Sequence, residues 1–208
     1  MTSYIRVSLL SILLFPLGLF GQRFILTNYT TRDGLPNANI LSIAQDKAGF
    51  IWIGTLHGLC RYDGKEFKTY YSQSGQLLHW IYDIVQASSG EMYVTSLFDV
   101  YLVKQGFVQK IPFTRKPGEK KYSGQVGRLL ALKNNKIWAL TSEGIYELKK
   151  DHFEPLELTG LPGAGDSTFC KQIAETEDTI YFNYGKKIFF SVKGRKAELL
   201  IESPKEIG

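Results

Sequence analysis

The histidines and acidic residues of the chain lack the spacing that catalytic or metal sites need. His57, His79 and His152 are predicted to lie in or beside loops, and no two of them stand at the His-x-x-x-His spacing of a helical metal site. The acidic run at 175–178 fits a solvated hairpin turn better than a catalytic carboxylate pair. We therefore expect no catalytic residue, no metal and no cofactor in this chain.

Aromatic and basic side chains offer binding chemistry instead. Trp80 is predicted to start a strand beside a connection, where an indole can contact a ligand. Strand direction predicts that the connections between repeats and the turns between second and third strands emerge on one face. The candidate ligand-binding residues on this face are Trp80, His57, His79, Phe98, Arg115, Lys116, Lys120 and Lys121.

The four bases of this set belong to the 112–125 connection, which contains one acid, Glu119. Two interpretations stay open for this basic run. One is a solvated loop; the other is a binding site for an acidic glycan or another anionic small ligand near the mouth of the central channel of a propeller. Nucleic acid is not expected, because the basic residues are not interleaved with aromatic ones and the net charge of +5 is small.

Short strand-like runs recur at a period of 41 to 45 residues. Each repeat holds one central apolar run, one apolar segment before it and two after it; the central runs are 51–55, 92–96, 137–141 and 180–184. Four short strands per period are typical of a β-propeller blade. The sequence therefore predicts an all-β fold, a β-propeller with four four-stranded blades at about 40–71, 80–111, 126–158 and 170–202.

The central run of each repeat is apolar at successive positions, as in a strand that is buried on both faces. Trp52 and Trp138 hold the same position in two of these runs. We expect both indoles to pack between neighbouring blades rather than to bind sugar.

The N-terminal part carries two further predictions. Residues 1–21 are predicted to be a secretory signal peptide, because an apolar run from 7 to 20 follows Arg6 and is too short to span a membrane. An uncleaved signal anchor is the alternative. Residues 24–30 are predicted to be a closing strand, because Tyr29 precedes Ile40 by the same 11 residues that separate the corresponding positions of the next repeat.

The closing strand completes no blade of this chain, since the repeat at 170–202 has its own fourth strand. We therefore expect residues 22–208 to be part of a larger propeller of the seven-bladed type. Cys60 and Cys170 fall in the first and fourth repeats, on nearly opposite sides of such a ring, and we expect them not to form a disulfide.

The first repeat resembles the two-component regulator propeller repeats of Gram-negative bacteria. The resemblance rests on three motifs, Asp33-Gly-Leu-Pro-Asn37, Gly49-Phe-Ile-Trp-Ile-Gly-Thr55 and Arg61-Tyr-Asp-Gly64, and later repeats keep only the strand pattern. The resemblance implies an exported, periplasmic sensor module of a two-component signal-transduction receptor. A membrane helix and a cytoplasmic histidine kinase would follow in the full receptor. Its ligand would be an oligosaccharide or another anionic small molecule, and a homodimer of the full receptor stays open.

Two other functions stay open on the residues alone. One is a fragment of an exported propeller lyase or glycosidase, which would need acids, histidines or tyrosines that converge on one face. The other is a protein-interaction scaffold, which would show an exposed apolar patch. We expect no kinase chemistry here, because the sequence has neither a phosphoacceptor histidine on a helix nor a glycine-rich ATP lid.

Overall fold

The structure, a computed structural model, describes residues 26–114, 121–132, 135–156, 173–176, 179–184, 187–192 and 197–202. The regular elements in this part of the chain are strands, apart from one turn of 3-10 helix at Thr31–Asp33. The all-β class is thus confirmed. None of the helical structure in the described ranges has the length and apolar character of a membrane span. The predicted signal peptide, residues 1–21, lies outside them.

The strands fall into four groups of four, each an antiparallel meander, which we call units one to four. Unit one holds β1 (Ile40–Gln45), β2 (Ile51–Thr55), β3 (Gly58–Tyr62) and β4 (Phe67–Ser72), and unit two holds β5 (Asp83–Gln86), β6 (Met92–Thr95), β7 (Val100–Val103) and β8 (Phe107–Ile111). Unit three holds β9 (Val126–Ala131), β10 (Ile137–Thr141), β11 (Gly144–Lys149) and β12 (His152–Pro155), and unit four holds β13 (Ile173–Glu175), β14 (Thr179–Tyr184), β15 (Lys187–Val192) and β16 (Ala197–Glu202).

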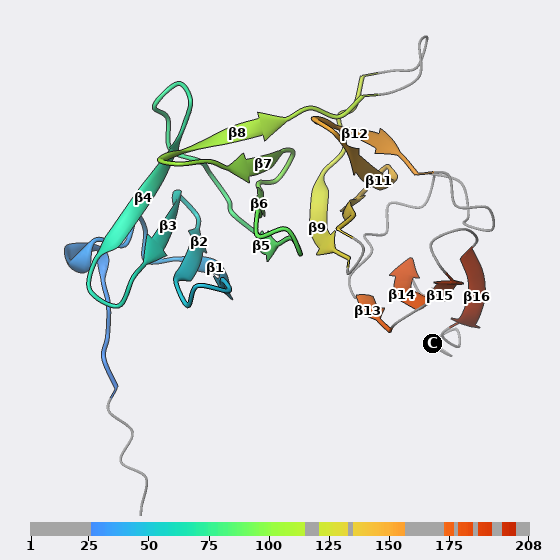
Figure 1. Ribbon diagram of the computed structural model, residues 1–208, viewed down its shortest axis with the longest axis horizontal. Coiled ribbons are helices and arrows are strands. Elements are labelled where there is room, and N and C mark those ends of the chain that lie inside the picture. Colours follow the sequence, from blue (N-terminus) through green and yellow to red (C-terminus); the bar gives the residue numbers. More distant parts are fainter. Residues whose placement is uncertain are drawn as a thin grey trace, which may run out of the picture.

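The units follow one another along an arc (Figure 1). The first strands lie toward one side of it, β1 against β5 and β5 against β9. On the outer side, the end of β4 pairs in parallel with β8 through Tyr71 and Phe107, so that units one and two share an eight-stranded sheet. The chain after β8 continues this pattern, since Phe113 bridges in parallel to Phe153 of β12. Neighbouring units are therefore joined at the rim by backbone as well as by side chains.

Successive apolar residues bury the second strand of each of the first three units on both faces. All residues of β6 and β10 are buried, and β2 is buried from Trp52 to Thr55. Strands that alternate apolar and polar residues would cover a core on one face only. The continuous apolar runs instead serve two neighbouring sheets at once, which is the packing that the sequence predicts for stacked blades.

Two cores fill the space between units. The first joins Trp52, Leu59 and Tyr70 of unit one to Ile81 and Val94 at unit two. The second joins unit two to unit three; among its buried members are Tyr93, Val100, Leu129, Ile137, Tyr146 and Phe153. Because each core needs both partner sheets, the units are expected to stabilise one another rather than to fold singly.

The motif before β1 closes the other face of unit one. Leu35 is buried with Ile53 and Cys60, on the face opposite Trp52. Pro36 lies against Gly58, where a side chain would place its Cβ only 2.6 Å from the proline ring. Cys60 is a free thiol, and burial raises its pKa to about 12. Cys170 lies outside the described residues.

The predicted closing strand is not found in its described part, residues 26–30. Leu26 is 93% exposed, and Thr30 caps the 3-10 helix by accepting the Arg32 backbone N–H. Tyr29 contacts unit one through its side chain, with a 2.6 Å hydrogen bond between its hydroxyl and that of Tyr62. The spacing identified a position in the repeat, but a strand also needs a neighbouring strand edge to pair with, and residues 26–30 have none.

Candidate ligand-binding pocket

A side-chain hydroxyl holds the turn between the second and third strands in units one and two. In unit one, Thr55 Oγ1 donates a hydrogen bond to the Gly58 carbonyl (2.8 Å) and accepts one from the His57 N–H (3.2 Å). In unit two, Ser96 Oγ donates to the Asp99 carbonyl (3.5 Å) and accepts from the Asp99 N–H (3.2 Å). A hydroxyl at the end of the second strand thus fixes the loop that follows it.

This loop presents His57 in unit one and Phe98 at the same place in unit two. His57 is exposed, and 49% of the Phe98 surface is exposed. Asp99, next to Phe98, forms an ion pair of 2.6 Å with Lys110 and accepts a 3.3 Å hydrogen bond from the Tyr101 hydroxyl. Burial, followed by the charge of the Asp99 carboxylate, raises the pKa of Tyr101 to about 12.

The connection from β4 to β5 sets Trp80 in an unusual backbone conformation. Its φ of 56° lies in the left-handed region that bulky residues rarely adopt. The conformation is held by hydrogen bonds from the Trp80 N–H to the Leu56 carbonyl (2.9 Å) and from the Ile81 N–H to the Thr55 carbonyl (3.1 Å). Ile81 is fully buried, whereas Trp80 is 40% exposed. The indole is therefore displayed at the surface by a backbone anchored on both sides.

Trp80 precedes strand β5 rather than starting it, which corrects the sequence prediction, because β5 begins at Asp83. Residues 80–82 still donate backbone hydrogen bonds, but the acceptors of the first two lie in unit one. The residue is thus part of the junction between units.

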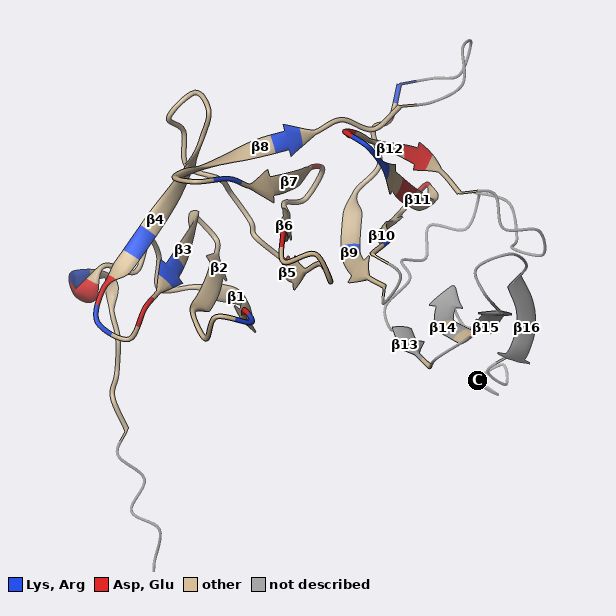
Figure 2. Ribbon diagram, viewed as in Figure 1, with Lys and Arg blue, Asp and Glu red and all other residues tan. Residues whose placement is uncertain are grey.

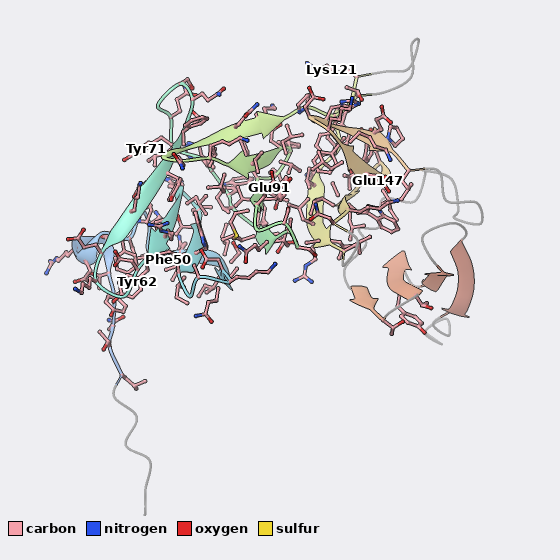
Figure 3. All side chains as sticks on the ribbon, in the orientation of Figure 1. Phe50, Tyr62, Tyr71, Glu91, Lys121 and Glu147 are labelled. Carbon is pink, nitrogen blue, oxygen red and sulfur yellow. The ribbon has the colours of Figure 1, made fainter. Side chains whose placement is uncertain are left out.

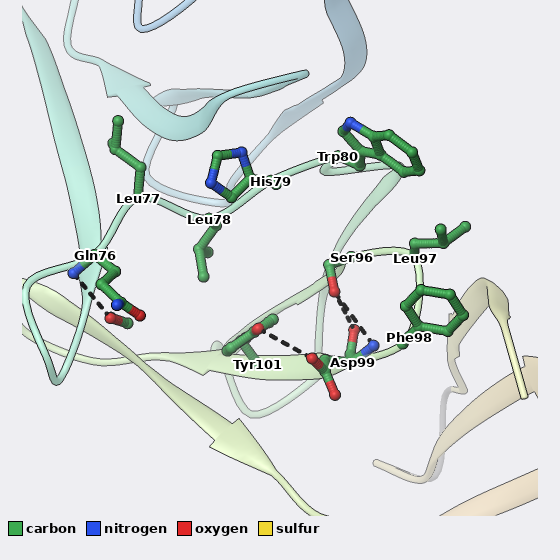
Figure 4. Close-up of a pocket in the computed structure, with 11 residues that line it drawn as sticks. Gln76, Leu77, Leu78, His79, Trp80, Ser96, Leu97, Phe98, Asp99 and Tyr101 are labelled. Carbon is green, nitrogen blue, oxygen red and sulfur yellow. Dashed lines mark hydrogen bonds between the residues drawn. The ribbon is translucent and has the colours of Figure 1, made fainter. Parts of the chain in front are cut away.

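A pocket of about 360 Å³ opens between this connection and the turn of unit two (Figure 4). Its walls mix aromatic, apolar and hydrogen-bonding side chains, and its lining residues are Ser72, Gln76, Leu77, Leu78, His79, Trp80, Ser96, Leu97, Phe98, Asp99 and Tyr101. Small-molecule sites commonly combine these features: a concave shape, aromatic walls and a few polar groups.

The structure brings together several of the predicted binding residues. His79, Trp80 and Phe98 line the pocket. His57 is not part of the lining, but its ring meets that of His79 edge to face, with 5.1 Å between centroids. The sequence-based list missed Tyr101, which lies in β7 two residues after Asp99 and donates a hydrogen bond to it.

The basic run of the 112–125 connection is only partly described. Lys121 is exposed and is labelled in Figure 3, whereas Arg115, Lys116 and Lys120 lie outside the described residues. Lys, Arg, Asp and Glu are spread over the ribbon (Figure 2). Among the residues that the structure describes, the pocket lining contains no Lys or Arg, and its one acid, Asp99, is paired with Lys110. The pocket therefore suits a neutral polar ligand.

Within the described ranges, no three His, Cys, Asp or Glu side chains lie close enough together to hold a metal ion. Trp52 and Trp138 are 4% and 1% exposed, as their predicted packing role requires. Among the three tryptophans, Trp80 alone can stack on a ligand without rearrangement of a core.

Comparison with known proteins supports the same fold. Residues 34–57 match the family of the two component regulator propeller. A relative, Histidine kinase P4 of Formosa agariphila, is 39% identical over 64 residues, which make up 31% of this chain and 5% of that protein. The chain thus corresponds to a small part of this relative's length.

Three solved structures share the arrangement at low sequence identity. The extracellular domain of BT3049, described as a hybrid two component system of B. thetaiotaomicron, gives a TM-score of 0.64 at 17% identity over 84% of this chain and 26% of that one. The extracellular domain of BT4673 of the same organism gives 0.60 at 20% identity, covering 79% and 23%. PorZ, a surface component of the type-IX secretion system of Porphyromonas gingivalis, gives 0.62 at 12% identity, covering 83% and 28%.

At these identities the structural matches bear on the fold alone, and they confirm its propeller class. The number of blades in a complete ring stays a prediction. The family assignment rests on the motifs of the first repeat, because the match to the family covers the Gly-Leu-Pro segment and the strand that contains Trp52. The chain therefore carries a repeat of the two component regulator propeller family.

Proposed function

We propose that this chain is the ligand-sensing propeller module of an exported two-component receptor and that the pocket beside Trp80 binds the ligand. The family repeat and the extracellular domains of BT3049 and BT4673 among the structural neighbours support a sensor-type module outside the cytoplasm. No catalytic role is assigned to the chain, and signal transfer would rest on parts of the receptor beyond it.

The observation that carries the proposal is the convergence of two exposed aromatic side chains on one hollow. Trp80 comes from the connection between units one and two, and Phe98 comes from the β6–β7 turn of unit two. Their side chains are 40% and 49% exposed, although large aromatic side chains are usually buried in a core. A bound molecule would cover both rings and would span the junction between units one and two. Ligand binding would in this way be coupled to the packing of neighbouring units.

The chemistry of the lining favours an oligosaccharide. Aromatic faces pack on the apolar faces of sugar rings, and Gln76, Ser96 and His79 offer the donors and acceptors that hydroxyl groups need. A neutral sugar agrees with the described part of the lining, whose acid Asp99 is paired with Lys110. An acidic sugar would draw on the 112–125 connection, whose basic residues would then contribute through screened, salt-sensitive attraction.

The test is a calorimetric titration of the protein with a panel of neutral and acidic oligosaccharides. Trp80→Ala and Phe98→Ala should each weaken binding by about tenfold or more, the range of one lost aromatic contact of about 1–3 kcal/mol. Tyr71→Ala is the matched control, because Tyr71 is an aromatic residue of similar exposure (44%) that does not line the pocket.

Replacement of Arg115, Lys116, Lys120 and Lys121 together by Gln separates the two kinds of sugar. The variant should weaken binding of acidic sugars at low salt and leave neutral sugars unchanged. Equal affinity of wild type, Trp80→Ala and Phe98→Ala for every sugar that binds would refute the pocket as the binding site.

A further inference from the structure

A second hollow lies at the opposite ends of the strands, between units one and two. It has a volume of about 480 Å³ and is formed by the turns after β1, β5 and β7. Its lining residues are Asp46, Ala48, Phe50, Trp52, Arg61, Tyr70, Gln86, Gly90, Glu91, Met92, Leu102, Val103, Lys104 and Gln105. We call it the turn-side cleft. In a meander these turns emerge at the end opposite the turns that shape the pocket beside Trp80, so the two hollows are separate.

Arg61 is held rigidly at the wall of the turn-side cleft. It lies in β3 directly across from Trp52, and its guanidinium carbon is 4.1 Å from the centre of the Phe50 ring and 5.9 Å from that of Trp52. Contacts of this kind between a cation and an aromatic face fix the plane of the guanidinium group. The side chain is thus placed before any ligand arrives.

The side chain of Arg61 has an unused hydrogen-bond donor in the part of the chain that the structure describes. Its Nε atom is buried and has no hydrogen-bond partner, and its guanidinium forms no ion pair with any residue that the structure describes. A buried donor without a partner carries a desolvation cost. A guanidinium group that is held in place and has free N–H donors is suited to bind a carboxylate or a sulfate through parallel hydrogen bonds.

The acids that line the cleft are engaged elsewhere. Asp46 accepts the backbone N–H groups of Ala48 and Phe50 (both 3.0 Å) and the indole N–H of Trp52 (2.8 Å). Glu91 accepts hydroxyl hydrogen bonds from Ser89 (3.1 Å) and Tyr93 (3.2 Å). Neither acid forms an ion pair with Arg61, so the fork of Arg61 is left for an external oxygen acceptor.

We infer that the turn-side cleft is a binding site for an oxyanion, a carboxylate or sulfate group of a small molecule, received by the guanidinium of Arg61. The formal charges of the lining balance, with Arg61 and Lys104 against Asp46 and Glu91. Attraction by net charge is therefore weak, and the site selects by directed hydrogen bonds. It should accept acetate or sulfate and reject chloride.

The experiment follows the side-chain Nε–H resonance of Arg61 by NMR in the 208-residue protein, with sodium sulfate, sodium acetate or sodium chloride added at matched ionic strength. We expect a saturable shift of this resonance with sulfate or acetate and no saturable shift with chloride. The indole N–H of Trp52 should move with it. The indole N–H of Trp138 in unit three is the internal control and should stay in place.

Two variants at Arg61 and one control variant complete the test. Arg61→Met and Arg61→Lys should both weaken oxyanion binding by about tenfold or more, as measured by the indole N–H resonance of Trp52. The methionine removes the positive charge, and the lysine keeps the charge but removes the two parallel N–H donors of the guanidinium. Lys68→Met is the matched control, since Lys68 pairs with Arg61 across the sheet but is exposed. It should change affinity by less than about twofold.

An equal response to sulfate and chloride, or retained affinity in a folded Arg61→Lys protein, would overturn the inference. In each variant, an indole N–H resonance of Trp138 at its wild-type position indicates that the protein is folded. Neither outcome bears on the pocket beside Trp80, which is tested with different ligands and different variants.

Discussion

Units one and three place a tryptophan at the same strand position and satisfy its indole N–H in different ways. In unit one, Trp52 donates to Asp46 in the turn before its strand, at 2.8 Å. In unit three, Trp138 donates at 3.1 Å to Glu147, the residue directly across from it in β11. The indole N–H of Trp138 thus bonds a side chain of the neighbouring strand, whereas that of Trp52 bonds a side chain of a turn.

The residue across from the tryptophan decides the rest of each environment. In unit three, Glu147, which is labelled in Figure 3, is almost fully buried and forms ion pairs with Lys136 (3.0 Å) and with Lys149. In unit one, Arg61 lies across from Trp52 beside aromatic rings, and it forms no ion pair with a carboxylate that the structure describes. The same strand position thus carries a residue in ion pairs in unit three, and in unit one it carries the arginine to which we assign the oxyanion site.

The largest effect is expected where the tryptophans themselves are removed. Trp138→Ala should lower the free energy of unfolding by about 4 kcal/mol and Trp52→Ala by about 3 kcal/mol, because both leave a cavity and Trp138 is the more buried. Urea denaturation followed by circular dichroism measures both. A larger loss for Trp52→Ala would show that the turn-bonded indole is the stronger anchor and would reverse the comparison.

A smaller effect is expected from Glu147→Gln. The amide still accepts the Trp138 N–H but loses both charge interactions, and the two lysines are nearly half exposed, so about 1–2 kcal/mol of unfolding free energy should be lost. Asp46→Asn is the matched change in unit one and should cost less, since its partners are neutral N–H groups. Denaturation midpoints of the two variants should therefore rank with Glu147→Gln as the less stable.

The smallest effect concerns pH. Burial alone would raise the pKa of Glu147, but hydrogen bonds from Lys149, Lys136 and Trp138 outweigh burial and lower it from the usual 4.5. A carboxyl with a lowered folded pKa stabilises the protein above its unfolded pKa, and this contribution is lost as pH falls through the folded value. The stability gap between wild type and Glu147→Gln should hence narrow below pH 4.5. Parallel pH profiles would contradict this electrostatic account of unit three.

The sequence predicted the parts of this molecule that depend on repetition. Apolar runs at a constant period place the strands, and the buried positions of Trp52 and Trp138 follow from runs that have no polar face. The position of Trp80, His79 and Phe98 on one face followed from strand direction alone. These features are local or periodic, and each is encoded several times.

Features that depend on one tertiary contact were not predictable. The left-handed backbone of Trp80 arises from hydrogen bonds to carbonyls of unit one, which no local pattern encodes. Residues 26–30 are likewise not in a strand here, because spacing cannot supply a partner edge, and their role in closing a larger ring stays a prediction. The free guanidinium of Arg61 became visible only when the partners of Asp46 were known.

The pocket beside Trp80 is tested most directly by the fluorescence of its tryptophan. Trp80 is 40% exposed, while Trp52 and Trp138 are buried, so acrylamide should quench mainly Trp80. The account predicts that a bound oligosaccharide shifts the emission to shorter wavelength and protects it from acrylamide, and that both effects disappear in Trp80→Phe. A ligand that binds the protein while the quenching of Trp80 stays unchanged would contradict the proposed site.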